Sequence, residues 1–106
     1  MSFRDAQQAV DRWVGQFQEG YFAPLANVAR LAEEVGELAR EVNHHFGPKT
    51  QKPDEQVGSI PMELADILFV VICIANSQHI DLDDAFAQMM AKVTSRDAGR
   101  WTRKAR

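Results

Sequence analysis

The 106-residue sequence contains a single cysteine, so an intramolecular disulfide is excluded. Cys73 lies in the apolar run 67–75, a position that predicts a buried, reduced thiol. This run is also the longest in the chain, and its nine residues fall well short of the roughly 18 that a membrane-spanning helix needs. The N-terminal segment MSFRDAQQAVDRW has no apolar stretch of the kind found in secretory signals. We therefore expect a cytoplasmic protein without a membrane partner.

Glycine and proline are scarce, with 6 and 4 residues, while 45% of the chain is apolar and 25% is charged. This composition excludes a disordered or fibrous protein. The length allows one domain over residues 1–106. A basic tail, residues 96–106, carries five basic side chains and one acidic one, whereas residues 1–95 have a net charge of −7. The tail could attract phosphates, but the acidic remainder repels a nucleic-acid backbone, so nucleic acid is not an expected partner.

The spacing of apolar residues is helical almost throughout and predicts an all-α, four-helix bundle-like fold. We expect a first helix over about 4–18 and a second from Pro24 to Phe46. The polar segment 47–58 is expected to form a loop. A third helix is expected from the Ser59 cap to about Gln78, and a fourth from the Asp81 cap, in a box-like arrangement with Asp84, to about Thr94.

The second and third predicted helices differ in how their apolar residues are arranged. The second repeats apolar residues at steps of three and four, which predicts a stripe facing the core: Leu25, Val28, Ala32, Val35, Ala39, Val42 and Phe46. The third is apolar on every side over 67–75. A 106-residue chain rarely buries such a helix by itself. We therefore expect a homo-oligomer, a dimer or a tetramer.

Acidic residues gather on two of the predicted helices. Glu34, Glu37 and Glu41 fall on one narrow strip of the second helix at about 100° per residue, and Glu63 and Asp66 share a face of the third. Each acid alone fits a solvated helix face. If the two helices pack antiparallel, however, the carboxylates converge, and their repulsion favours binding of a divalent cation. Ligands that are all oxygen favour Mg²⁺ or Mn²⁺ over zinc.

A di-iron site would need two Glu-x-x-His pairs in a bundle of this kind. The sequence supplies one such pair, at Glu41 and His44. This alternative is therefore disfavoured.

The segment LAEEVGELARE, a polar loop and then MELADILFVVICIANSQHIDLDDAF resemble the all-α nucleotide pyrophosphohydrolases of the MazG type. The signature of that family is EExxE, a variable gap and ExxD. Its positions are matched here by Glu33, Glu34 and Glu37, a gap of 25 residues, and Glu63 and Asp66. The resemblance extends from about Trp13 to Trp101.

The resemblance implies Mg²⁺-dependent hydrolysis of a (deoxy)nucleoside triphosphate to a nucleoside monophosphate and pyrophosphate, with Mn²⁺ as a possible substitute for Mg²⁺. Such an enzyme would clean or regulate the nucleotide pool. The metal ligands carried over are Glu34, Glu37, Glu63 and Asp66. Glu33 and Glu34 become the catalytic residues, with Glu33 orienting the attacking water.

The resemblance also suggests basic residues that contact the phosphates. Family members tend to carry a lysine and an Asn/Arg pair near the fourth helix. Lys92, Arg96 and Arg100 lie at or near these positions, although Ser95 stands where asparagine is commoner.

Other candidates for binding substrate follow from the residues themselves. Tyr21 and Phe22 fall in a predicted loop and could stack on a base, whereas Trp13 and Phe17, one turn apart, are expected in the core. Asn76 is polar inside an apolar helix, which predicts a hydrogen bond to a ligand or across an interface. The competing hypothesis is a noncatalytic helical module that dimerises, for which the carboxylates would be ordinary surface charge.

Overall fold

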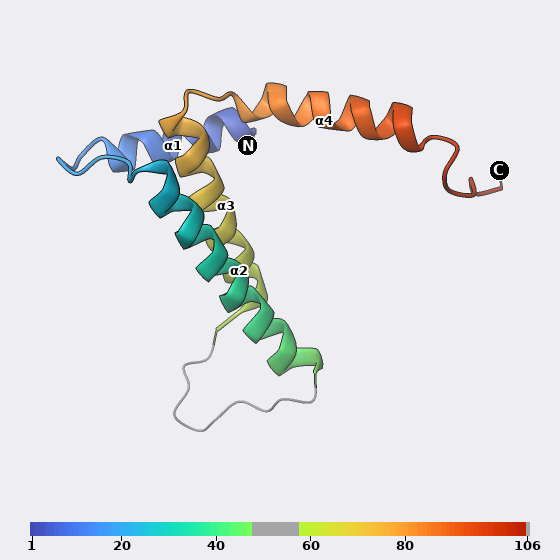
Figure 1. The fold of residues 1–106 in the computed structure, drawn as a ribbon, viewed down its shortest axis with the longest axis horizontal. Coiled ribbons are helices and arrows are strands. Elements are labelled where there is room, and N and C mark those ends of the chain that lie inside the picture. The colour runs from blue at the N-terminus through green and yellow to red at the C-terminus, as the bar shows by residue number, and fades with distance from the viewer. Residues whose placement is uncertain (48–57, 106) are drawn as a thin grey trace.

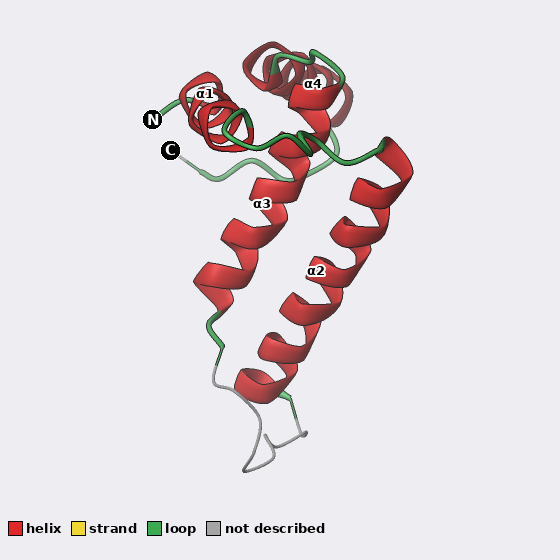
Figure 2. Ribbon diagram, turned by 90° about the vertical axis from the view of Figure 1, so that its left-hand side faces the viewer, coloured by secondary structure: helices red, strands yellow, loops and turns green. Residues whose placement is uncertain are grey.

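The computed structural model describes residues 1–47 and 58–105, and within these ranges the chain forms helices and no strand. The four helices are α1 (Phe3–Val14), α2 (Pro24–Phe46), α3 (Ile60–Ser77) and α4 (Leu82–Asp97). Helices α2 and α3 run antiparallel side by side, α1 crosses the end of this pair, and α4 extends away from it (Figures 1 and 2). The all-α prediction is confirmed. The predicted loop 47–58 lies, except for its two ends, outside the described residues.

Helix α1 is shorter than predicted, ending at Val14 rather than near residue 18. Beyond Val14, the N–H groups of Gln16 and Phe17 bond to carbonyls three residues back, at 3.3 and 3.1 Å, which ends the α-helical pattern. At the other end the Ser2 hydroxyl accepts from the Asp5 N–H, and the Asp5 carboxylate accepts from the Ser2 N–H. This capping box was not recognised in the sequence.

The predicted caps of the last two helices are partly confirmed. The Ser59 hydroxyl accepts a hydrogen bond from the Met62 N–H at the start of α3. At the start of α4 the Asp81 carboxylate accepts from the Asp83 N–H rather than forming a box with Asp84. Helix α4 continues to Asp97, about three residues further than predicted.

The predicted orientation of α2 is wrong, because its apolar stripe faces outward. Leu25 is 85% exposed, Val35 is 49% exposed and Phe46 is 81% exposed. The face that carries the buried residues of α2 instead presents Asn27 and Glu41. The apolar core is formed on α3, by Val70, Ile72, Cys73 and Ala75. The polar face of α2 therefore packs against α3, which buries Glu41 and brings Glu34 toward α3, whereas Glu33 and Glu37 stay exposed.

Helix α3 is the one helix in the described part of the chain that is long and apolar enough to cross a membrane, judged by length and composition only. The apolar run 67–75 makes up half of this helix, and all 18 of its residues together have a mean hydropathy of 1.8. A core helix of a folded domain passes the same test, and α3 packs against both α1 and α2.

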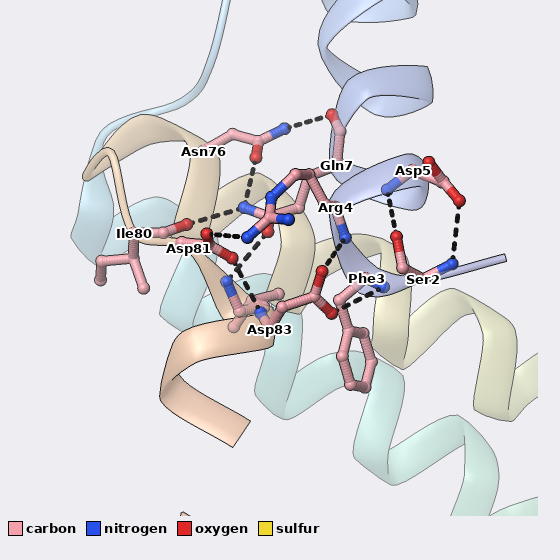
Figure 3. Close-up of polar contacts among 10 residues, drawn as sticks. Ser2, Phe3, Arg4, Asp5, Gln7, Asn76, Ile80, Asp81 and Asp83 are labelled. Carbon is pink, nitrogen blue, oxygen red and sulfur yellow. Dashed lines mark hydrogen bonds and ion pairs between the residues drawn. The ribbon is translucent and has the colours of Figure 1, made fainter. Parts of the chain in front are cut away.

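A polar network fixes α1 to the end of α3 and the start of α4 (Figure 3). The Gln7 side chain donates to the Asn76 amide oxygen at 2.9 Å and to the Ile80 carbonyl at 2.7 Å. Asn76 donates back to the Gln7 carbonyl at 2.9 Å. Arg4 forms an ion pair with Asp81, which lowers the pKa of that carboxyl group chiefly through their hydrogen bond. Asn76 therefore has a structural role within the chain.

Asp83 provides a second connection between α1 and α4, since its carboxylate accepts from the N–H groups of Phe3 and Arg4 at 3.1 and 3.2 Å. We expect Asp83→Ala to lower the free energy of unfolding by about 1–3 kcal/mol, because two helix-terminal donors lose a charged acceptor. Asp84→Ala removes an exposed acid from the same first turn and should cost only about 0.5 kcal/mol. Urea unfolding followed by circular dichroism would compare the two, and equal losses would contradict this role for Asp83.

Candidate functional site

Three carboxylates from facing sides of α2 and α3 converge in the structure. Glu34, Glu63 and Asp66 each offer one oxygen, and these oxygens lie within 4.8 Å of one another. Glu63 and Asp66 share a face because they are three residues apart on α3. Antiparallel packing then brings Glu34 on α2 to the same level. We refer to Glu34, Glu63 and Asp66 as the carboxylate cluster.

The carboxylates of the cluster repel one another, and this raises the pKa of one of them. Burial raises the pKa of Glu63, and the neighbouring carboxylate charges raise it further, Asp66 most and then Glu37, Glu34 and Glu41. Like charges at this spacing disfavour one another's ionised forms. A hard divalent cation such as Mg²⁺ or Mn²⁺ prefers this all-oxygen donor set, so the residues present fit such an ion.

The other two acids of the signature are not part of this cluster. Glu37 is exposed and forms an ion pair with Arg40 at 3.3 Å, although its charge still contributes to the raised pKa of Glu63. Glu33 is exposed beside Glu34. The structure thus brings together three of the five signature acids.

The position of Glu41 on the strip had suggested a surface acid, but the structure buries this residue. It is only 3% exposed, and its Oε1 has no hydrogen-bond partner in the described residues. Its Oε2 lies 3.9 Å from His45 Nε2. A Cβ atom on Gly58 would come within 2.5 Å of Glu41 Oε1, so glycine leaves the space that this carboxylate occupies.

A cavity of about 310 Å³ is lined by residues of α1, of the loop after it and of α2 and α3. We call it the aromatic cavity, and it is lined by Trp13, Val14, Phe17, Glu19, Gly20, Tyr21, Phe22, Asn27, Arg30, Phe69 and Cys73. Arg30 lies about one turn before Glu34 on α2, and Phe69 lies about one turn after Asp66 on α3. The cavity and the cluster are therefore consecutive along both helices.

The expectation that Trp13 and Phe17 belong to the core is wrong. They are 55% and 48% exposed and pack edge to face, with ring centroids 5.0 Å apart, at the aromatic cavity. The Arg30 guanidinium lies 5.1 Å from the centre of the Phe22 ring, within the range of a cation–π contact. Cys73 is buried, as predicted, and burial raises the pKa of its thiol.

Sequence reasoning missed Asn27 and Arg30 as candidate site residues. They precede Glu34 at intervals of seven and four residues, so they share its strip of α2. That spacing was the available signal. It was not used because only the acids of the strip were considered as ligands, and Arg30 was not assigned a role.

Three residues predicted to bind substrate line a larger cavity of about 760 Å³ between α1 and the end of α3: Tyr21 and Phe22, which also line the aromatic cavity, and Asn76, which does not. The Tyr21 hydroxyl donates to the Asp11 carboxylate at 2.7 Å and accepts from the Asn76 amide at 2.9 Å. Burial and the Asp11 hydrogen bond raise the pKa of Tyr21 to about 12. The polar atoms of Tyr21 and Asn76 are thus engaged within the chain.

The basic candidates lie away from the carboxylate cluster. Lys92, Arg96 and Arg100 follow the distal half of α4 and the turn after it, which lead away from α2 and α3 (Figure 1). Arg96 forms an ion pair with Asp97 at 3.1 Å, and Arg100 stacks on Trp101 at 5.0 Å. A single chain does not bring these side chains to the cluster.

Comparison with known proteins gives consistent matches. The profile of the MazG nucleotide pyrophosphohydrolase domain matches residues 22–101. The Bacillus subtilis (strain 168) protein YpjD is 53% identical over 103 residues, which cover 97% of this chain and 93% of YpjD. The crystal structure of YPJD from Bacillus subtilis superposes with a TM-score of 0.78 at 52% identity, covering 87% of this chain and 94% of that one. The crystal structure of the Bacillus-conserved MazG protein, a nucleotide pyrophosphohydrolase, gives a TM-score of 0.75 at 52% identity, covering 87% and 88%.

Proposed function

Because the chain belongs to the MazG nucleotide pyrophosphohydrolase family, we propose that it hydrolyses (deoxy)nucleoside triphosphates to the monophosphate and pyrophosphate in a reaction that needs Mg²⁺. The observation that carries this proposal is the approach of Glu34, Glu63 and Asp66 to within 4.8 Å on facing helices. Such an enzyme would remove unwanted nucleotides or adjust the nucleotide pool.

The carboxylate cluster would hold the divalent cation, with Glu37 as a further ligand once it leaves Arg40. When bound, the cation would neutralise charge on the phosphate oxygens. Phosphoryl chemistry depends mainly on positioning and electrostatic stabilisation, which carboxylates fixed on two packed helices support. Exposed Glu33, adjacent to Glu34, would accept a hydrogen bond from the attacking water and orient it. Tyr21 and Phe22, at the aromatic cavity, would contact the base.

The proposal includes a homo-oligomer, a dimer or a tetramer. The outward-facing apolar residues of α2 and the exposed Leu64 and Leu68 of α3 are the surfaces that a second copy would cover. Lys92, Arg96 and Arg100 would serve phosphate binding only in an assembly in which α4 of one copy meets the carboxylate cluster of another. The assembly and the phosphate contacts are therefore linked within this proposal.

The experiment that tests the function is incubation of pure protein with mixed nucleoside triphosphates and Mg²⁺, followed by chromatographic separation of the products. We expect nucleoside monophosphates and pyrophosphate. Diphosphates with inorganic phosphate would mean cleavage of a different bond. Unchanged triphosphates over a range of protein and metal concentrations would favour the noncatalytic helical module.

We expect millimolar Mg²⁺ or Mn²⁺ to raise the melting temperature. The raised pKa of Glu63 shows that the folded state disfavours its charge, and a bound cation relieves the repulsion in the native state only. At a metal concentration 100 times the Kd the stabilisation is about 2.7 kcal/mol, or roughly 10 °C or more for a chain of this size. Scanning calorimetry with Mg²⁺, and with matched ionic strength supplied by NaCl, would check this. Identical melting curves would contradict the metal site.

A further inference from the structure

Asn27 is the most deeply buried polar residue in the described part of the chain, at 1% exposure. Its Nδ2 donates to the Phe22 carbonyl at 3.3 Å, whereas its Oδ1 has no hydrogen-bond partner in residues 1–47 and 58–105. A buried amide oxygen left without a donor destabilises the fold, so its retention calls for an explanation.

The orientation of this amide is defined by its surroundings. If the amide were rotated by 180°, its oxygen would face the Phe22 carbonyl oxygen, and two acceptors would oppose each other. Oδ1 is therefore the atom turned away from Phe22. Asn27 lines the aromatic cavity, so that cavity is open space beside this residue.

The aromatic cavity has the properties of a site for a flat heteroaromatic ring. Its volume of about 310 Å³ falls at the lower end of the range for small-molecule pockets. Its aromatic side chains supply surfaces for stacking: Trp13, Phe17, Tyr21, Phe22 and Phe69. Arg30, on the same face of α2 as Asn27, is a donor, so the two residues offer one donor and one acceptor to the edge of a bound ring.

The distance to the carboxylate cluster suits a nucleotide. Asn27 precedes Glu34 by seven residues, which is about 10 Å along the axis of α2. A ribose joined to the first phosphate can extend over such a distance. We propose that the aromatic cavity receives the nucleobase and that Asn27 Oδ1 accepts a hydrogen bond from an N–H group of that base. The identity of the ligand as a nucleotide rests on the proposed function.

The proposal makes Asn27 a specificity-determining residue. Bases with a free N–H at the inserted edge satisfy its oxygen, whereas bases methylated at that nitrogen leave it buried and unpaired. Sites built to hydrogen-bond a substrate N–H reject analogues that lack it. Asn27 Oδ1 is buried, so a base reaches it only when a side chain that lines the cavity moves. Phe22 is the side chain we expect to move, because it lies in the α1–α2 loop and is 51% exposed.

The test uses binding rather than turnover. Titration calorimetry with Mg²⁺ would compare UMP, CMP, AMP and GMP with analogues whose base N–H groups are replaced by N-methyl groups. For the base that binds most tightly, we expect methylation to weaken binding to the wild type at least tenfold, since one buried acceptor is left unpaired. In Asn27→Leu, of similar shape but without the acceptor, the penalty should fall below threefold. Gln18→Leu, exposed in the same loop and outside the cavity lining, should keep the full penalty.

Two results would overturn the role of Asn27. One is an equal methylation penalty in the wild type and Asn27→Leu. The other is a wild-type protein whose affinity does not depend on the base or does not fall when the base is methylated. This second result needs only the wild type, so it can be obtained even if Asn27→Leu does not fold. If the protein hydrolyses triphosphates but binds methylated and unmethylated bases equally, the role of Asn27 is wrong and the proposed function stands. If it distinguishes these bases but does not hydrolyse triphosphates, the role of Asn27 stands and the proposed function is wrong.

Discussion

Asp66→Asn should reduce hydrolysis of nucleoside triphosphates by about a thousandfold while leaving the helical content unchanged. Asp66 supplies one of the three converging oxygens, and an amide oxygen is a weaker ligand for a hard cation. Loss of several kcal/mol of charge stabilisation, at about 1.4 kcal/mol for each factor of ten, corresponds to this reduction. Initial rates of pyrophosphate release, measured at saturating Mg²⁺, would check the result.

The same substitution should stabilise the protein in the absence of metal. The charge of Asp66 is the largest electrostatic contribution to the raised pKa of Glu63, so its removal moves the Glu63 pKa back toward the ordinary value and lowers the repulsion. The melting temperature in EDTA should rise by a few degrees, and the further increase caused by Mg²⁺ should shrink. Lower activity together with a higher melting temperature in EDTA indicates that a metal ligand has been lost. A damaged fold would instead lower both the activity and the melting temperature.

Asp84→Asn is the matched control, because it makes the same chemical change at an exposed position in the first turn of α4. It should retain nearly normal activity. If Asp66→Asn were fully active, the reaction would have to occur elsewhere in the molecule. If Asp84→Asn were equally impaired, the chain would depend on diffuse negative charge rather than on three positioned ligands.

Helical periodicity predicted the class and order of the elements because capping residues and apolar spacing are local signals. The start of α2 at Pro24 and the Ser59 cap of α3 are examples. The orientation of α2 could not be predicted in this way. The stripe from Leu25 to Phe46 is the more apolar face, yet the face with Glu34 and Glu41 packs against α3. Local sequence does not reveal whether an apolar face packs inside one chain or against another.

The residues of the candidate site, like the fold, were predicted only in part. The spacing of the acids predicted that four carboxylates converge if the two helices pack antiparallel, and the structure brings together Glu34, Glu63 and Asp66 but not Glu37. Glu41 shows the limit. Glu41 lies on the same strip but outside the signature, and it was therefore interpreted as surface charge. Its approach to Gly58 and its burial at 3% exposure depend on how the ends of α2 and α3 meet, which local sequence does not reveal. Glu41→Gln would therefore alter a buried side chain and could not replace Asp84→Asn as the control for Asp66→Asn.

The exposed surface of the chain is the starting point for the second major prediction. A compact protein of 11.9 kDa exposes about 6,000 Å², whereas this chain exposes 8430 Å². The excess, about 2,400 Å² by difference, is well above the roughly 800 Å² that each partner buries in a standard interface. The radius of gyration of 17.8 Å likewise exceeds the approximately 13 Å of a compact chain of this length. A single copy therefore leaves unburied the amount of surface that a stable oligomer requires.

We expect the protein to sediment at no less than twice its 11.9 kDa chain mass at micromolar concentration, and Val35→Glu to shift it toward the monomer. Val35 lies in the middle of the outward apolar stripe, and burying a carboxylate there without a partner is costly. The dissociation constant should rise at least a hundredfold. Analytical ultracentrifugation across a concentration series would measure it.

Gly36→Glu tests whether the effect depends on the face rather than on added charge. Gly36 is the next residue, on the exposed face with Glu33 and Arg40, and a Cβ there meets no atom within 4 Å. Its new carboxylate is four residues before Arg40, a favourable spacing on a helix, and glycine is the poorer helix former. This variant should remain fully assembled and melt at or above the wild-type temperature. Dissociation of both variants would place the interface around the whole of α2, and a wild-type protein sedimenting at 11.9 kDa would mean that the apolar stripe serves another partner.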